Sequence, residues 1–112
     1  MDNPRNEVSI ELAGETRTMR ASFAAIRNIE RDLGNILPLI DKIGQGNVGV
    51  DQCATIIFYG LKGFDDHRLT KDAVGEAVMD RGLSAVMPAV VEFVTGTLKG
   101  VAVGKPQPED KA

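Results

Sequence analysis

The chain has few aromatic side chains: they make up 4% of its 112 residues and include no tryptophan. Enzyme pockets and nucleic-acid stacking surfaces both make use of aromatics, so this composition favours neither. An excess of positive charge is also lacking, because 13 Lys and Arg stand against 16 Asp and Glu and leave a net charge of −3. Binding to a phosphate backbone needs clustered positive charge, and we therefore expect no nucleic-acid partner.

Cysteine and histidine occur once each, as Cys53 and His67. A lone cysteine forms no internal disulfide, and its apolar neighbours indicate a buried, unreactive thiol. No strained nucleophile turn surrounds Ser9, Ser22 or Ser84, and His67 is expected in an exposed, Asp-rich loop. We therefore expect no enzyme, no cofactor and no metal. The polar start and the absence of a long apolar run predict no signal peptide, no membrane span and a cytoplasmic protein.

The first third of the chain carries the clearest pattern. Residues 8–12 alternate apolar and polar, residues 13–15 supply a turn in which Gly14 can take a positive φ, and residues 16–20 form the return strand. Ser22 can cap a following helix, which Gly34 ends. We predict that this hairpin and helix form one packing unit with a shared set of buried residues: Ile10, Met19, Phe23, Ile26 and Leu33.

Four further helices are predicted from apolar spacing, caps and glycine stops. They cover about 36–43, 52–63 with Asp51 as N-cap, 71–81 with Thr70 as N-cap, and 84–99, where Pro88 suggests a start nearer Met87. The expected fold is α+β, an N-terminal β-hairpin followed by a small bundle of about five helices. The expected organisation is a flexible arm over 1–6, a single domain over 7–100 and a disordered tail over 101–112.

A series of short motifs extends over about the first half of the chain: Val8-x-Ile10-x-Leu12, Gly14-Glu15-Thr16, Thr18 to Ile26, Glu30, Leu33-Gly34, Leu37-x-Leu39-Ile40, Val50-Asp51-Gln52 and Ile56-x-x-x-Gly60-Leu61. In these motifs the chain resembles the tail assembly chaperones of gene transfer agents and siphophage-like tails. The resemblance implies a non-enzymatic factor that binds the tape-measure protein or tail tube subunits during morphogenesis. A structural component of the finished tail and a small regulatory binding module remain open, as does homo-oligomerisation.

Two segments, one acidic and one rich in glycine, could each be a binding site or an ordinary part of the surface. Asp72, Glu76 and Asp80 recur every fourth residue and lie on one helix face. This stripe could be a docking strip or, as we favour, a solvated face; a straight row does not converge on a cation. The glycine-rich segment 44–49 lacks the Lys-Ser/Thr of a phosphate-binding loop and is interpreted as a connector.

The last helix has two apolar stripes and few charges. One stripe contains Val86, Val90, Phe93, Val94 and Thr97, and its Phe93 suits the protein's own core. Either the whole helix is buried or one stripe meets a partner. The hypothesis is that the second stripe binds the partner, through Met87, Val91, Val94 and Leu98.

Overall fold

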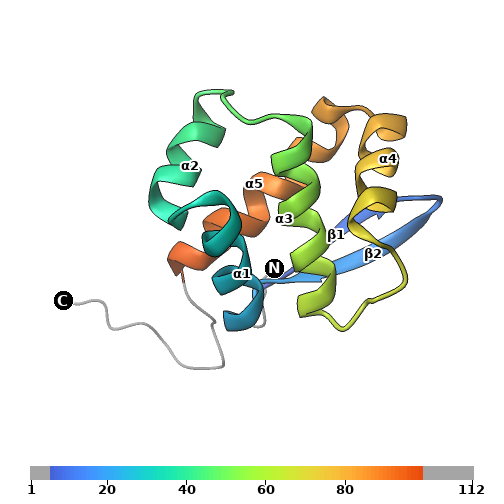
Figure 1. Cartoon of the computed structure of the whole chain (residues 1–112), viewed down its shortest axis with the longest axis horizontal. Helices are drawn as coiled ribbons and strands as arrows, with labels where there is room; N and C mark the ends of the chain where they lie inside the picture. Colours follow the sequence, from blue (N-terminus) through green and yellow to red (C-terminus); the bar gives the residue numbers. More distant parts are fainter. Residues whose placement is uncertain (1–5, 100–112) are drawn as a thin grey trace.

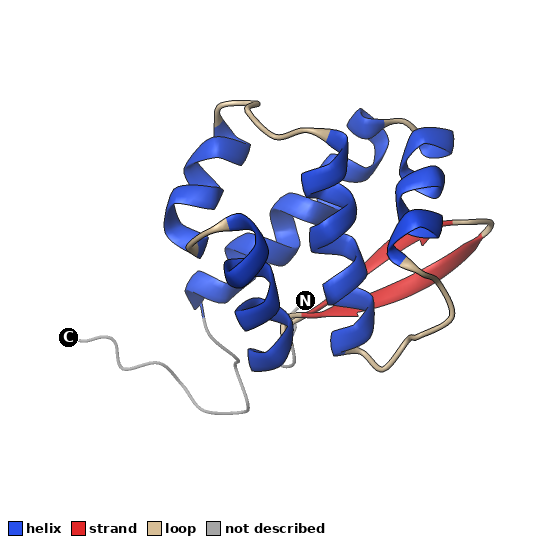
Figure 2. Ribbon diagram, viewed as in Figure 1, coloured by secondary structure: helices blue, strands red, loops and turns tan. Residues whose placement is uncertain are grey.

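The computed structural model of the chain describes residues 6–99. It shows a two-stranded antiparallel hairpin followed by five helices, so the predicted α+β class is confirmed (Figures 1 and 2). The elements are β1 (Glu7–Leu12), β2 (Glu15–Arg20), α1 (Phe23–Leu33), α2 (Ile36–Gly44), α3 (Val50–Gly63), α4 (Lys71–Arg81) and α5 (Leu83–Lys99). Most of the predicted N-terminal arm and the whole predicted C-terminal tail lie outside the described residues.

The hairpin turns through two residues with positive φ, Ala13 at 53° and Gly14 at 84°. A turn of this kind matches the right-handed twist of paired strands. The register places Val8 opposite Met19 and Ile10 opposite Arg17, so these four side chains share the inner face. The inner face of the hairpin packs against α3 and α5, which cross near the centre of the molecule (Figure 1).

Polar caps and glycines fix the ends of α1 and α4 as predicted. The hydroxyl of Ser22 accepts a hydrogen bond from Ala25 N at 3.1 Å, and that of Thr70 accepts one from Ala73 N at 3.1 Å. Gly34 and Gly82 follow the two helices with φ of 97° and 95°, values that favour glycine.

The starts of α3 and α5 differ from the prediction. Helix α3 begins at Val50 with Gly49 as N-cap, so Asp51 lies in the first turn and is not the cap. Gly49 N donates a hydrogen bond to the side chain of Gln52 at 3.0 Å. This bond satisfies a backbone N–H at the start of the helix, where no intrahelical partner is available, and Asp51 is not needed for it. Helix α5 begins at Leu83, so Pro88 lies inside it and not in its first turn, where a start near Met87 would place it.

Phe23 is the clearest error in the predicted packing unit. Ile10 and Met19 are buried and Ile26 and Leu33 are half-buried against the core, but Phe23 is 78% exposed. The buried face of α1 is centred on Ile29, and at about 100° per residue Phe23 points about 120° away from it. The ring instead lies beside the Arg27 guanidinium, 5.3 Å from its carbon.

Truncating Phe23 is therefore expected to change stability little. Phe23→Ala should lower the free energy of unfolding by less than about 1 kcal/mol, because no cavity forms at an exposed position. Urea unfolding followed by circular dichroism measures the change. A loss of about 3 kcal/mol would mean that the ring is packed in solution, contrary to the structure.

Candidate functional site

Helix α5 places one predicted stripe in the core. Val86, Val90, Phe93 and Val94 are each no more than 1% exposed and pack against the other elements. Their spacing of four, three and one residues keeps them on one side of the helix. The prediction that Phe93 anchors this helix in the protein's own core is therefore confirmed.

The opposite side of α5 is an exposed, almost uncharged strip. We define the outer stripe of α5 as Ser84, Pro88, Val91, Thr95 and Leu98. These residues alternate spacings of four and three over a length of about 21 Å. All are exposed except Thr95, which is half-buried and whose hydroxyl donates to Val91 O at 2.7 Å. Between residues 82 and 98 only Glu92 is charged.

The structure separates the four residues of the predicted partner stripe. Val91 and Leu98 are 39% and 58% exposed, whereas Val94 is fully buried. Met87 is half-buried, with its sulfur accepting from the Cys53 thiol at 3.5 Å. Of these four residues, only Val91 and Leu98 are therefore exposed to a partner in this conformation.

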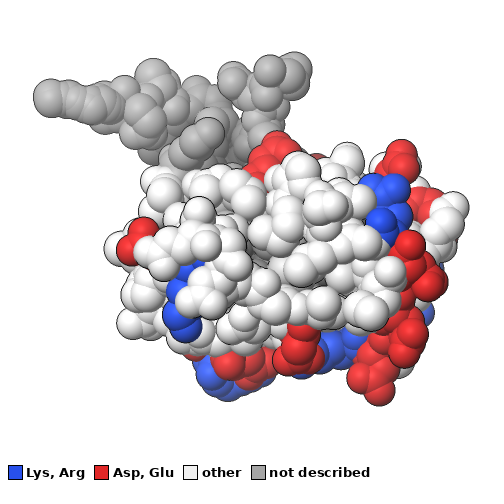
Figure 3. All heavy atoms as spheres, turned by 90° about the horizontal axis from the view of Figure 1, so that it is seen from above, with Lys and Arg blue, Asp and Glu red and all other residues white. Residues whose placement is uncertain are grey.

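A second uncharged segment is the loop between α2 and α3. The loop from Gln45 to Gly49 carries no charge and, with Val48 half-buried, is otherwise exposed. Figure 3 looks onto the end of the molecule where this loop and the start of α5 lie, and it shows a broad uncharged area with charged side chains along its margin. In a chain that is 26% charged, such an area is a candidate contact surface.

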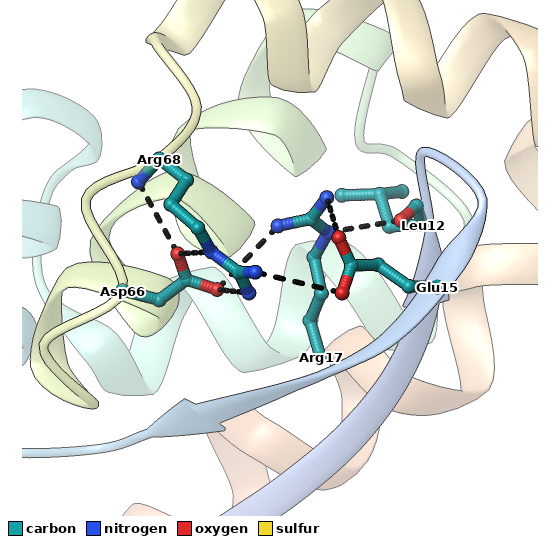
Figure 4. A network of polar contacts seen from close by, with 5 residues as sticks. All are labelled: Leu12, Glu15, Arg17, Asp66 and Arg68. Carbon is teal, nitrogen blue, oxygen red and sulfur yellow. Dashed lines mark hydrogen bonds and ion pairs between the residues drawn. The ribbon is translucent and has the colours of Figure 1, made fainter.

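A buried ionic network joins the hairpin to the loop between α3 and α4 (Figure 4). The side chains of Arg17 and Asp66 are only 4% and 7% exposed and pair at 3.5 Å. Arg17 also donates to Leu12 O at 2.9 Å and pairs with Glu15 at 3.1 Å. Arg68 donates twice to Asp66, both at 2.9 Å. The hydrogen bonds from Arg68 hold the pKa of Asp66 at about 2, against the opposing effect of burial.

Sequence reasoning missed this network, although one signal was present. Arg17 lies two residues before the buried Met19 on β2, so strand alternation already places both side chains on the inner face. Asp66 carries no comparable signal, because its position depends on how the loop returns over the hairpin. The charges of the network pair with one another, although the buried Nη1 of Arg17 makes no hydrogen bond. We interpret the network as a structural clamp.

The remaining chemical candidates do not assemble a catalytic centre. Cys53 is buried, and burial raises the pKa of its thiol, as expected for an unreactive cysteine. His67 is exposed, with its Nε2 3.7 Å from a carboxylate oxygen of Asp65. Within residues 6–99, no three His, Cys, Asp or Glu side chains are grouped to hold a metal ion.

The α4 carboxylates lie on the outside of the molecule. Asp72, Glu76 and Asp80 are all exposed, as a solvated face and a docking strip both require. None of the helices in the described part of the chain is long and apolar enough to cross a membrane.

Comparison with known proteins identifies the family. No curated protein and no solved structure matches the chain. A family model described as "Phage tail tube protein, GTA-gp10" matches residues 5–100, which include every helix and strand of the fold. The match reaches well beyond the first half, to which the sequence resemblance was limited. The chain therefore belongs to this family of phage tail assembly and tail proteins, which are generally non-enzymatic.

Proposed function

We propose that the protein is a tail assembly chaperone that binds the tape-measure protein or tail tube subunits before they polymerise. It shields apolar segments of the partner in the cytoplasm and takes no part in chemistry. The observation that carries the proposal is the outer stripe of α5, an exposed helix face that lacks the usual charged residues. Family membership supports a role in tail morphogenesis.

The spacing of the outer stripe suits a helical partner. Residues three and four apart form ridges on a helix, and ridges of one helix pack into grooves of another. Val91 and Leu98 supply the apolar contacts, while the internal hydrogen bond of Thr95 removes a polar group that a partner would otherwise have to satisfy. An amphipathic helix of the partner can therefore dock along this face at little desolvation cost.

A second candidate is a structural component that remains in the tail. The family description, which names a tail tube protein, favours it. The two functions differ in particle composition: a chaperone is absent from purified tails, whereas a structural component is present in a fixed ratio to the tube. Quantitative mass spectrometry of finished tails distinguishes them.

A charge placed on the outer stripe should abolish partner binding. Val91→Glu is expected to leave the fold intact, because the side chain is 39% exposed. Binding should fall by at least about tenfold, because the carboxylate enters an apolar contact without a counter-ion. The assay is co-expression with the tape-measure protein of the same tail, followed by pulldown, with circular dichroism on the same sample.

Leu37→Glu is the matched control. It places the same charge at an exposed leucine, 64% accessible, in the first turn of α2 and not on the helix that carries the stripe. The control should bind like the unchanged protein. Intact folding together with intact binding in Val91→Glu contradicts the assignment of the stripe, and equal losses in both variants show an unspecific effect of negative charge.

A further inference from the structure

A groove between α3 and α4 is separate from the outer stripe of α5. Its volume is about 420 Å³, within the usual range for binding pockets of about 300–1,000 Å³. Its apolar lining is formed by Val50, Ala54, Gly75 and Met79. Met79 is 65% exposed, an unusual position for a large apolar side chain with no partner over it.

Gly75 leaves space in the groove. A Cβ at this position would lie 3.8 Å from the Cβ of Ala54, in ordinary contact, so the missing side chain leaves room beside Ala54. A bulky residue of a partner can enter there, between Ala54 on α3 and Met79 on α4.

The rim of the groove is acidic. Asp51, Asp72 and Glu76 line it together with one cation, Lys71, so acidic side chains outnumber basic ones. Lys71 pairs with Asp51 at 3.5 Å. Among the described residues, Asp72 and Glu76 make no ion pair or side-chain hydrogen bond. In Figure 3 acidic side chains gather along the right-hand margin, the side on which α4 and the hairpin tip lie in Figure 1.

We infer that this groove binds a basic amphipathic segment of a partner protein. One apolar side chain of the segment enters between α3 and α4, and its Lys or Arg residues face Asp72 and Glu76. The two carboxylates lie one helical turn apart, so cations at the same spacing on a partner helix can meet both. The choice of a basic occupant follows from charge complementarity, because a neutral or acidic segment would leave both carboxylates unpaired.

A synthetic helical peptide tests the inference. The probe has about 18 residues, with leucines at spacings of three and four and lysines on the flanks, and its neutral analogue carries glutamine in place of lysine. Fluorescence anisotropy should show the lysine peptide binding about tenfold more tightly than the analogue. The attraction should weaken as salt is added.

Matched variants separate the groove from general attraction to an acidic protein. The double variant with Asp72→Lys and Glu76→Lys should weaken binding of the lysine peptide at least about tenfold. The double variant with Asp41→Lys and Glu92→Lys makes the same change in net charge on exposed positions of α2 and α5 and should bind normally. Equal losses in the two double variants overturn the inference, as does the absence of binding to the unchanged protein.

The apolar part of the groove has its own variant. Met79→Ser should weaken binding of both peptides several-fold, and an unchanged affinity contradicts an apolar anchor at this place. Val91→Glu should not affect either peptide, because Val91 lies on another helix and does not line the groove. Failure of the groove inference therefore leaves the proposed role of the α5 stripe untouched, and the reverse also holds.

Discussion

Replacing Gly63 with alanine is expected to lower the free energy of unfolding by about 3 kcal/mol. A Cβ on Gly63 would overlap the carbonyl oxygen of Arg20 and lie 3.1 Å from the hydroxyl of Ser22. The overlap involves backbone, which cannot rotate away as the end of a long side chain could. The last turn of α3 or the link between β2 and α1 must therefore shift, and Ser22 is the cap that starts α1.

Gly44→Ala is the matched control for this prediction. Gly44 is the last residue of α2, as Gly63 is of α3, and a Cβ there meets nothing within 4 Å. Its substitution should change the free energy of unfolding by less than about 1 kcal/mol. Alanine lowers the conformational entropy of the unfolded chain relative to glycine, and this effect favours the folded state. Urea unfolding of both variants measures the difference. Equal stability of the two would show that α3 and β2 do not approach as closely as the structure indicates.

Local signals predicted most of the fold. The hydroxyls of Ser22 and Thr70 satisfy orphan backbone donors, and Gly34 and Gly82 adopt conformations that other residues resist. These effects act within a few residues, so they can be inferred without tertiary structure. Pro88 was misjudged because a proline inside a helix is disfavoured locally, yet tertiary packing of Val86 and Val90 holds the helix on both sides of it.

The candidate site was only partly predictable, for a geometric reason. Val94 belongs to both apolar stripes of the last helix, and composition cannot show which way the helix is rotated against the core. The structure turns Phe93 and Val94 inward together, which leaves Val91 and Leu98 outside. The exposure of Phe23 also depends on tertiary packing. Its spacing of three residues from Ile26 is compatible with a shared buried face, but the rotation of α1 against the core leaves Phe23 exposed.

Replacing Asp66 with asparagine is expected to destabilise the protein by about 3 kcal/mol. The substitution keeps the shape of the side chain but removes the charge beside Arg17, whose side chain is 4% exposed. Removing one partner of a buried pair leaves the other charge without full compensation, and this loss exceeds that of a surface pair. Glu15, which pairs with the same arginine but is 49% exposed, provides the control. Glu15→Gln should cost less than about 1 kcal/mol.

The pH dependence of stability should reveal the same group. The folded state holds the pKa of Asp66 at about 2, below the ordinary carboxyl value of about 3.9. A carboxylate with a lowered pKa stabilises the fold above its ordinary pKa, and that contribution disappears as the pH falls towards the folded-state value. The difference in urea midpoint between the unchanged protein and Asp66→Asn should therefore be constant above about pH 5 and shrink between about pH 4 and 2. Since the other carboxyl groups titrate in both proteins, the difference isolates Asp66. A difference that persists unchanged down to about pH 2 would assign the loss to the shape of the amide and not to the ionic clamp.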